Sequence, residues 1–177
     1  MSAAAELPIR TLGAEEAAGR LGELAAILRD AVENGASVNF MAGLTEAEAT
    51  LFWRGQLAGI AEGSRTLLVA ERNGAIVGTA VLTLAPQPNA PHRGEIGKML
   101  VHSSLRRQGL GRRLLEEAEA AARRQGRTLL LLDTQTGSAG EVLYRRCGWR
   151  EYGVVPNHSH VPQGGLSPAT FFYKELS

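Results

Sequence analysis

The spacing of apolar residues divides the chain into alternating helix and strand segments. Apolar residues recur at helical spacing, and this predicts helices over residues 14–33, 45–61, 110–125 and 138–147. Runs of β-branched and apolar residues bounded by turn residues predict strands over residues 8–12, 65–71, 75–84, 96–101, 128–133, 149–155 and 169–176. Residues 36–43 have no clear period and read as a loop with two apolar anchors, Phe40 and Met41. Residues 156–168, rich in Pro, Gly and His, read as a long loop.

Two of these segments indicate how the strands are arranged. Asn73-Gly74 lies between two strand patterns and is a typical two-residue hairpin turn, so the flanking strands are expected to be antiparallel neighbours. The TLLLLD run of residues 128–133 is apolar on both faces, as in a central strand covered on both sides. Together with the alternation of strands and helices, these features predict an α/β fold with a mixed sheet and helices on both faces.

The composition narrows the class of protein. A length of 177 residues fits a single domain over 1–177. The formal net charge of +1 gives no case for a nucleic-acid or membrane partner, and the arginines of residues 106–113 are opposed by three glutamates on the same predicted helix. One cysteine, no signal-peptide pattern and no bilayer-length apolar run lead us to expect a cytoplasmic protein.

The stretch GEIGKMLVHSSLRRQGLG, residues 94–111, carries the strongest functional signal. An apolar strand runs into a turn rich in arginine and glycine that opens a helix, and free N–H groups at a helix start bind anions. A dinucleotide fingerprint requires a third glycine where Leu114 stands, although Asp133 lies at a suitable distance for the ribose acid. A Walker loop is excluded because no Gly-Lys-Ser/Thr is present, and a plain solvated helix start remains an alternative.

Two motifs in this order resemble the GNAT acetyltransferase superfamily. Arg106-x-x-Gly109-x-Gly111 looks like the acyl-CoA diphosphate turn of that family, and the segment Leu143-Tyr144 to Gly148-Trp149 looks like its L-Y-x-x-x-G-F/W signature. The resemblance covers nearly the whole chain. It implies a mostly antiparallel central sheet of about seven strands, flanked by about four helices, with acetyl-CoA as cosubstrate and no metal. Ser103 stands where many members have Pro, and Gly137 where many have Asn.

Four further runs narrow the resemblance to the tabtoxin-resistance type of acetyltransferase. These runs are GASVNFMAGL, GEIGKML, LLLLDTQTGSAGEVLY and GGLSPATFFYKEL. The resemblance implies acetyl transfer to the primary amine of a small molecule, such as an antibiotic or an amino-acid-like β-lactam toxin. Two alternatives stay open: an acetyltransferase acting on proteins or peptides, and a non-catalytic sensor that binds acyl-CoA.

The same resemblance assigns residues to the cosubstrate. It implies that the strand ending at Val101 parts from its neighbour and offers its backbone to the pantetheine arm and thioester. The residues expected to contact acetyl-CoA are Met99, Leu100, Val101, Arg106, Arg107, Gln108, Gly109, Leu110, Gly111, Arg112, Ser138 and Tyr144.

Three side chains are candidates for the chemistry. Glu95 starts the central strand and Asp133 ends the next one, so either could take the proton of the acceptor ammonium, and Glu95 is the first choice. Glu95 could instead be an ordinary exposed charge, and Asp133 a fixed anion for the ammonium or a turn cap. The resemblance makes Tyr144 the proton donor to the leaving thiolate, with packing against the sheet as the alternative.

The acceptor site is the least determined part of the sequence. Phe40, Met41, His92, Arg93, Asp133 and His158 are expected to line it. Covalent catalysis through Cys147 is the weaker scheme, because the sequence places no histidine beside it. His158 and His160 lack the neighbouring ligands that a metal site needs. A monomer and a homodimer are both compatible with the sequence.

Overall fold

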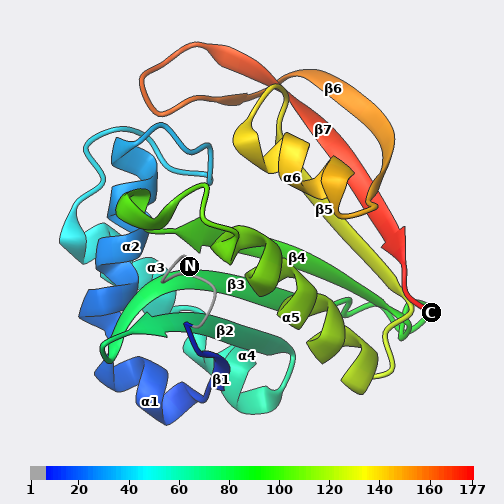
Figure 1. The fold of residues 1–177 in the computed structure, drawn as a ribbon, viewed down its shortest axis with the longest axis horizontal. Helices are drawn as coiled ribbons and strands as arrows, with labels where there is room; N and C mark the ends of the chain where they lie inside the picture. Colours follow the sequence, from blue (N-terminus) through cyan, green and yellow to red (C-terminus); the bar gives the residue numbers. More distant parts are fainter. Residues whose placement is uncertain (1–6) are drawn as a thin grey trace.

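Seven strands form one sheet in the order β1-β2-β3-β4-β5-β7-β6 in the computed structural model, which describes residues 7–177 (Figure 1). The strands are β1 (Ile9–Leu12), β2 (Arg65–Arg72), β3 (Ala75–Leu84), β4 (Arg93–Val101), β5 (Leu129–Gln135), β6 (Arg150–His160) and β7 (Leu166–Glu175). Only the β4–β5 pair is parallel, and the other pairs are antiparallel. The predicted fold class, a mixed and mostly antiparallel sheet flanked by helices, is confirmed.

The predicted hairpin turn is also confirmed. Asn73 and Gly74 both have positive φ, at 52° and 82°, as the turn that suits the right-handed twist of two paired strands requires. Arg72 and Ala75 pair across this turn.

The helices outnumber the expected four because each of the two N-terminal segments is broken. The helices are α1 (Ala14–Gly19), α2 (Leu21–Glu33), α3 (Glu46–Arg54), α4 (Leu57–Glu62), α5 (Leu110–Arg124) and α6 (Ala139–Arg146), with a short 3₁₀ turn, η2 (Ser103–Leu105). The first break falls at Arg20, whose backbone is not helical, at φ −122° and ψ 19°. Its guanidinium bonds Glu23 and the carbonyl of Gly74, so the bend ties α2 to the β2–β3 turn.

In the sequence, Thr45-x-x-Glu48 predicts a capping box, and the spacing behind it predicts an apolar face of Leu51, Phe52, Leu57 and Ile60. The capping box is confirmed, but the apolar face is partly wrong. Leu51 is 66% exposed, whereas Trp53, absent from the predicted set, is 1% exposed. The buried line of α3 runs through Ala49 and Trp53, one helical turn apart, which turns Leu51 outward.

The long loop predicted over residues 156–168 is a second correction. β6 continues to His160 and β7 begins at Leu166, so the segment forms the outer part of a β-hairpin. The register shifts between Val155 and Ser159, and Asn157 has a φ of 53°, so the strand carries an irregularity that disguises its period.

Helices cover the two faces of the sheet unequally. α5 and α6 lie on one face over Leu130, Leu132 and Phe172, whereas α1–α4 cover β1 to β4 on the other face (Figure 1). Since side chains alternate along a strand, Leu131, Asp133, Phe171 and Tyr173 point away from α5 and α6. We call the surface formed by Glu95, Leu131, Asp133, Phe171, Tyr173 and Tyr152 the open face. It lies on the side of the sheet opposite α5 and α6.

Membrane-spanning helices and clusters of metal-binding side chains are both absent from the described residues. No helix between residues 7 and 177 combines the length and apolar character that crossing a membrane requires. Within the same range, no group of three or more His, Cys, Asp or Glu side chains is arranged to hold a metal ion.

Candidate active site

The parallel pair β4–β5 opens part of the way along its length. The two strands pair only from Arg93 and Leu129 to Glu95 and Leu131, and beyond that point no register joins them. Figure 1 shows β4 and β5 diverging toward the end of the sheet where the α2–α3 loop and the β6–β7 hairpin lie. A strand that loses its partner leaves backbone N–H and C=O groups available for a ligand. The exit segment Met99 to Val101 lies beyond this point, so the structure places it where an extended pantetheine arm could pair.

A β-bulge shapes the same part of β4. Thr79 pairs with Leu100 and Val81 with Gly97, so Lys98 and Met99 stand opposite the single residue Ala80. Lys98 has a φ of 46°, and its carbonyl accepts a 2.8 Å hydrogen bond from the buried hydroxyl of Thr79.

The bulge reverses the alternation of side chains along the strand. Ile96, before the bulge, and Met99 and Val101, after it, all pack on the α5 side, whereas Leu100 belongs to the core under α1–α4. Lys98 contacts Phe52 of α3, so the bulge turns its side chain toward the α1–α4 side, which Glu95 also faces.

The turn between η2 and α5 has the features of an anion site. Gly109 takes the left-handed conformation, at φ 83°, as the residue that precedes α5, and no side chain caps this helix start. The first N–H groups of α5 therefore have no intrahelical partner, as binding of a diphosphate requires. Arg106, Arg107 and Gln108 are exposed around the turn, while Arg112 pairs with Glu116 one turn along α5 at 2.7 Å. The residues present fit a diphosphate group.

Ser103 explains how the chain manages without proline at this position. Its N–H and its hydroxyl donate to the two carboxylate oxygens of Asp30 in α2, at 2.8 and 2.7 Å. Proline could make neither bond. The Asp30–Ser103 contact therefore ties the exit of β4 to α2.

Glu95 and Asp133 are brought to the same face of the sheet. Partial desolvation raises the pKa of Glu95 above its ordinary value, and the negative charge of Asp133 raises it further, against the opposing charges of Lys98 and Arg93. A raised pKa brings a carboxylate closer to the value of an effective general base at neutral pH.

Two residues that the sequence analysis did not single out face these carboxylates. The Nζ of Lys98 lies 5.1 Å from the ring centre of Phe52. Desolvation lowers the pKa of Lys98, while the charges of Asp133 and Glu95 oppose the shift. Desolvation also raises the pKa of Tyr152 on β6, and the same two carboxylates add to it. The signal that could have found Lys98 is a lysine inside an apolar strand, in a chain that has only one other lysine, Lys174.

Tyr144 lies on α6 with its ring packed between Trp149 and Phe172, each at a centroid distance of 6.1 Å. Desolvation raises its pKa, and the charges of Asp133 and Cys147 add to the shift, so the phenol is protonated at neutral pH. The ring thus has the packing of the structural alternative, and the hydroxyl is in the protonation state that a proton donor needs.

Two other predicted residues have clear local roles. Ser138 is the N-cap of α6: its hydroxyl accepts from the N–H of Glu141 at 3.2 Å and contacts that of Thr134 at 3.0 Å. Cys147 is partly buried beside the main core, and desolvation raises the pKa of its thiol, which leaves less of the nucleophilic thiolate.

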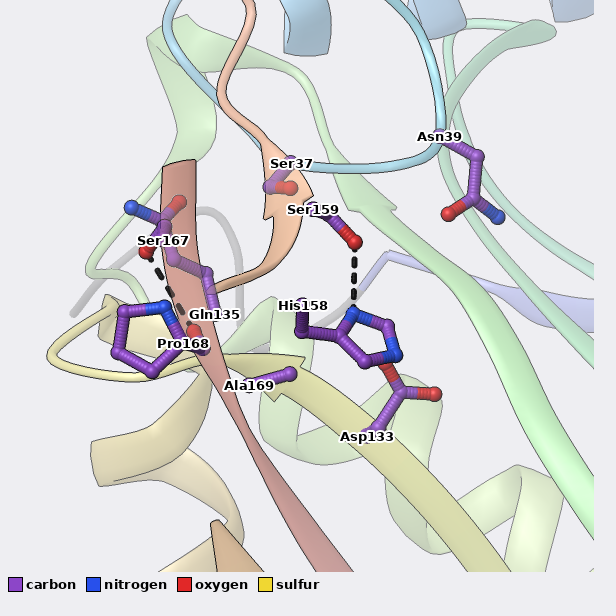
Figure 2. Close-up of a pocket in the computed structure, with 9 residues that line it drawn as sticks. All are labelled: Ser37, Asn39, Asp133, Gln135, His158, Ser159, Ser167, Pro168 and Ala169. Carbon is purple, nitrogen blue, oxygen red and sulfur yellow. Dashed lines mark hydrogen bonds between the residues drawn. The ribbon is translucent and has the colours of Figure 1, made fainter. Parts of the chain in front are cut away.

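A small polar pocket lies at the wide end of the divergence. Ser37, Asn39, Asp133, Gln135, His158, Ser159, Ser167, Pro168 and Ala169 line it, from the α2–α3 loop, β5, β6 and β7 (Figure 2). Its volume of about 20 Å³ suits little more than a water molecule. The N–H of Ala42 in the α2–α3 loop donates to the carbonyl of Pro162 at 2.9 Å, which joins this loop to the β6–β7 hairpin.

The other predicted acceptor residues are distributed around this region. His158 lines the pocket with Asp133, and its ring packs on Phe171 at 5.4 Å. Phe40 packs edge-on against Phe52 at 5.4 Å, next to Lys98. Met41 is 49% exposed, so it is not the apolar anchor that the loop pattern suggested.

His92 and Arg93 lie at the opposite end of β4 from the pocket. There the carbonyl of His92 accepts from Thr128 and Leu129, and Arg93 bonds Gln87. The structure does not bring these two residues to the pocket, although Arg93 acts on the pKa of Glu95.

A sheet whose parallel central pair parts beside an anion-binding helix start is typical of acyltransferases that use acyl-CoA. Comparison with known proteins agrees: the profile of the Acetyltransferase (GNAT) family matches residues 26–149. The chain belongs to this family, an acetyltransferase class whose cosubstrate is acetyl-CoA.

The individual proteins that resemble this chain share only part of its sequence. An "IAA acetyltransferase" of Azospirillum brasilense is 37% identical over 87 residues. The matched region spans about half of each protein, 49% of this chain and 55% of that relative. A ribosomal-protein-alanine N-acetyltransferase from Brucella melitensis is 27% identical with a TM-score of 0.77, over 96% of this chain and all of that one. A phosphinothricin acetyltransferase from Sinorhizobium meliloti, solved with acetyl-CoA, has a TM-score of 0.79 at 20% identity, over 97% and 89% of the two chains. It shows the fold alone.

Proposed function

We propose that this chain transfers acetyl from acetyl-CoA to the primary amine of a small molecule, by direct attack in a ternary complex. One observation carries the proposal. The pairing of β4 with β5 ends at Glu95 and Leu131, so the strands part next to the two carboxylates of the open face, Glu95 and Asp133. The thioester would lie along the unpaired exit of β4, and the acceptor would approach from the open face.

Gly97 supports this placement of the acceptor. It lies between Glu95 and Lys98 and is exposed, and a Cβ built on it would meet no atom within 4 Å. The site therefore has room beside the proposed base. The 20 Å³ pocket would form one wall of the acceptor site rather than the whole site.

The residues divide the chemistry as follows. Glu95 takes a proton from the acceptor ammonium, directly or through water, and the neutral nitrogen attacks the thioester carbonyl carbon. The N–H of Met99 or a neighbour stabilises the oxyanion. As the C–S bond breaks, the nitrogen loses its second proton to solvent, and the hydroxyl of Tyr144 protonates the departing thiolate and regains its own proton from solvent. The raised pKa of Cys147 argues against a covalent acetyl-cysteine intermediate.

A protein acceptor is the second candidate. It is favoured by the likeness to the ribosomal-protein-alanine N-acetyltransferase over nearly all of both chains. A peptide needs a continuous groove, whereas the contact between Ala42 and Pro162 bridges the wide end of the site. The tabtoxin-resistance likeness of the sequence favours a small amine, so we place an antibiotic or toxin of amino-acid type first among the acceptors.

Release of CoA thiol with a panel of acceptors tests the proposal. The panel consists of amino acids including L-phosphinothricin, simple amines, an amino-acid-like β-lactam, and peptides with N-terminal alanine. We expect thiol release with a small amine, and a Gly97→Val variant that keeps its KM for acetyl-CoA but loses affinity for the acceptor. Turnover restricted to peptides would establish the second candidate. Tight binding of acetyl-CoA without thiol release from any acceptor would identify a sensor and overturn the proposal.

A further inference from the structure

The two lysines of the chain have opposite surroundings. The Nζ of Lys174 bonds both carboxylate oxygens of Glu119 at 2.9 and 2.8 Å and the carbonyl of Cys147 at 2.8 Å, so all three of its donors are used. Lys98 forms none of the side-chain hydrogen bonds or ion pairs found among residues 7–177. Its one close partner is the face of the Phe52 ring.

The ammonium of Lys98 is nevertheless held in a defined place. The positive φ of the bulge and the bond from Thr79 to its carbonyl fix its backbone, and the ring of Phe52, itself packed on Phe40 and Trp53, supports its side chain. A partly buried charge without a hydrogen-bonded counter-charge is costly. The lowered pKa of Lys98 reflects this cost. An anion brought by a ligand would offset it.

The neighbours of Lys98 indicate which ligand would bring that anion. Glu95 and Asp133 are close enough to act on its pKa, yet neither forms an ion pair with it within 4 Å. The open face therefore offers two carboxylates suited to an ammonium, and Lys98 next to it offers one cation suited to an oxyanion. That is the charge pattern of an amino acid.

We propose that Lys98 binds the carboxylate of the acceptor, or an oxyanion in its place, and so selects acceptors that carry both an ammonium group and an anionic group. The inference rests on the proposed function and specifies its acceptor. In the competing account, Lys98 only compensates the charge of Glu95 and Asp133. That account predicts equal effects on every amine.

Kinetics with paired acceptors separates the two accounts. Each amino acid that the enzyme acetylates is compared with the amine that lacks its α-carboxylate, in wild type, Lys98→Met and Lys98→Arg, with Arg72→Met as a control for the loss of one exposed charge. We expect Lys98→Met to lower kcat/KM about 10- to 100-fold for the amino acid, as for loss of a charge-assisted hydrogen bond, and less than about threefold for the amine. Lys98→Arg should restore part of the loss. Equal losses for both acceptors, or no loss for the amino acid, would refute the proposal.

A binding measurement remains decisive if no acceptor turns over. Because Lys98 and Lys174 are the only lysines, reductive ¹³C-methylation gives two lysine resonances, which Lys98→Arg assigns. With CoA present, we expect L-methionine to move the Lys98 resonance and raise its apparent pKa, while 3-(methylthio)propylamine moves it much less. If L-methionine and L-phosphinothricin both leave this resonance unmoved, Lys98 is not a carboxylate site. That result would leave transfer to simple amines untouched.

Discussion

Two clusters of charged side chains in this protein contain the same residue types in opposite conditions. On the buried side of α5, Glu119 is 4% exposed and accepts from Lys174 and from the indole N–H of Trp149, so each group has its partners. At the other cluster, Glu95 on the open face and Lys98 next to it make no side-chain hydrogen bond with the described residues, and their pKa values shift toward each other. A satisfied cluster stabilises a fold, whereas an unsatisfied one is free to hold a ligand and exchange a proton.

Replacing Glu95 should have the largest effect on activity. We expect Glu95→Gln to lower kcat about 10²- to 10⁴-fold, the range for loss of a general base, with little change in the free energy of unfolding. Asp133→Asn is the matched variant, and it should mainly raise the KM for the acceptor. If Asp133→Asn instead causes the larger loss of kcat, Asp133 is the base.

Replacing Glu119 should lower the stability of the fold and leave the activity nearly unchanged, the reverse of the effect expected for Glu95. Glu119→Ala leaves the ammonium of Lys174 and the indole of Trp149 without their partner, and breaking a buried pair costs about 3–5 kcal/mol. Urea denaturation measures the loss, and kcat at 25 °C should stay within about twofold of wild type. A large loss of kcat in the folded variant would contradict the division into scaffold and site.

Tyr144 links the two regions of the account, because its ring packs in the core and its hydroxyl is the proposed proton donor to the thiolate. Tyr144→Phe keeps the packing on Trp149 and Phe172 and should lower kcat about 10- to 10³-fold, with an unchanged KM for acetyl-CoA and an unchanged melting temperature. An unaltered kcat would leave Tyr144 with a packing role only.

Replacing Glu71, a carboxylate that is paired where Glu95 is not, should have the smallest effect, and this effect on the free energy of unfolding should depend on pH. Hydrogen bonds from Arg10 and Arg20 lower the pKa of Glu71 to about 2. Because the folded pKa is below the ordinary value of 4.5, this contribution to stability is present above pH 4.5 and is lost as the pH falls toward 2. We expect Glu71→Gln to cost about 1–2 kcal/mol at pH 7, discounted because Arg10 is 40% exposed, and far less near pH 2. A cost independent of pH would exclude the ion pairs as its cause.

Most of the fold could be predicted because it depends on local patterns. The Asn73-Gly74 turn, the Thr45–Glu48 capping box and the buried stripe of α5 each combine residue type with spacing in a way that few conformations satisfy. The predictions of element boundaries were wrong where tertiary contacts override the periodic spacing of apolar residues. Arg20 breaks a helix to reach Gly74, and the irregularity after Val155 hides the extent of β6.

The site was only partly predictable for a related reason. Glu95 and Asp133 could be named because strand ends are visible in the sequence. Lys98 could not, because its orientation depends on a bulge defined by the pairing of β4 with β3, and Tyr152 faces the carboxylates only through the order β5-β7-β6. Contacts between distant segments leave no local pattern.

The pH dependence of CoA release tests the central claim most directly, with wild type and Glu95→Gln compared on the same amine acceptor. Since desolvation and Asp133 raise the pKa of Glu95, wild-type kcat should fall as the pH drops, with its acid limb above pH 4.5. Glu95→Gln should be slow at every pH and lack this limb. An acid limb that persists unchanged in Glu95→Gln would show that the base lies elsewhere.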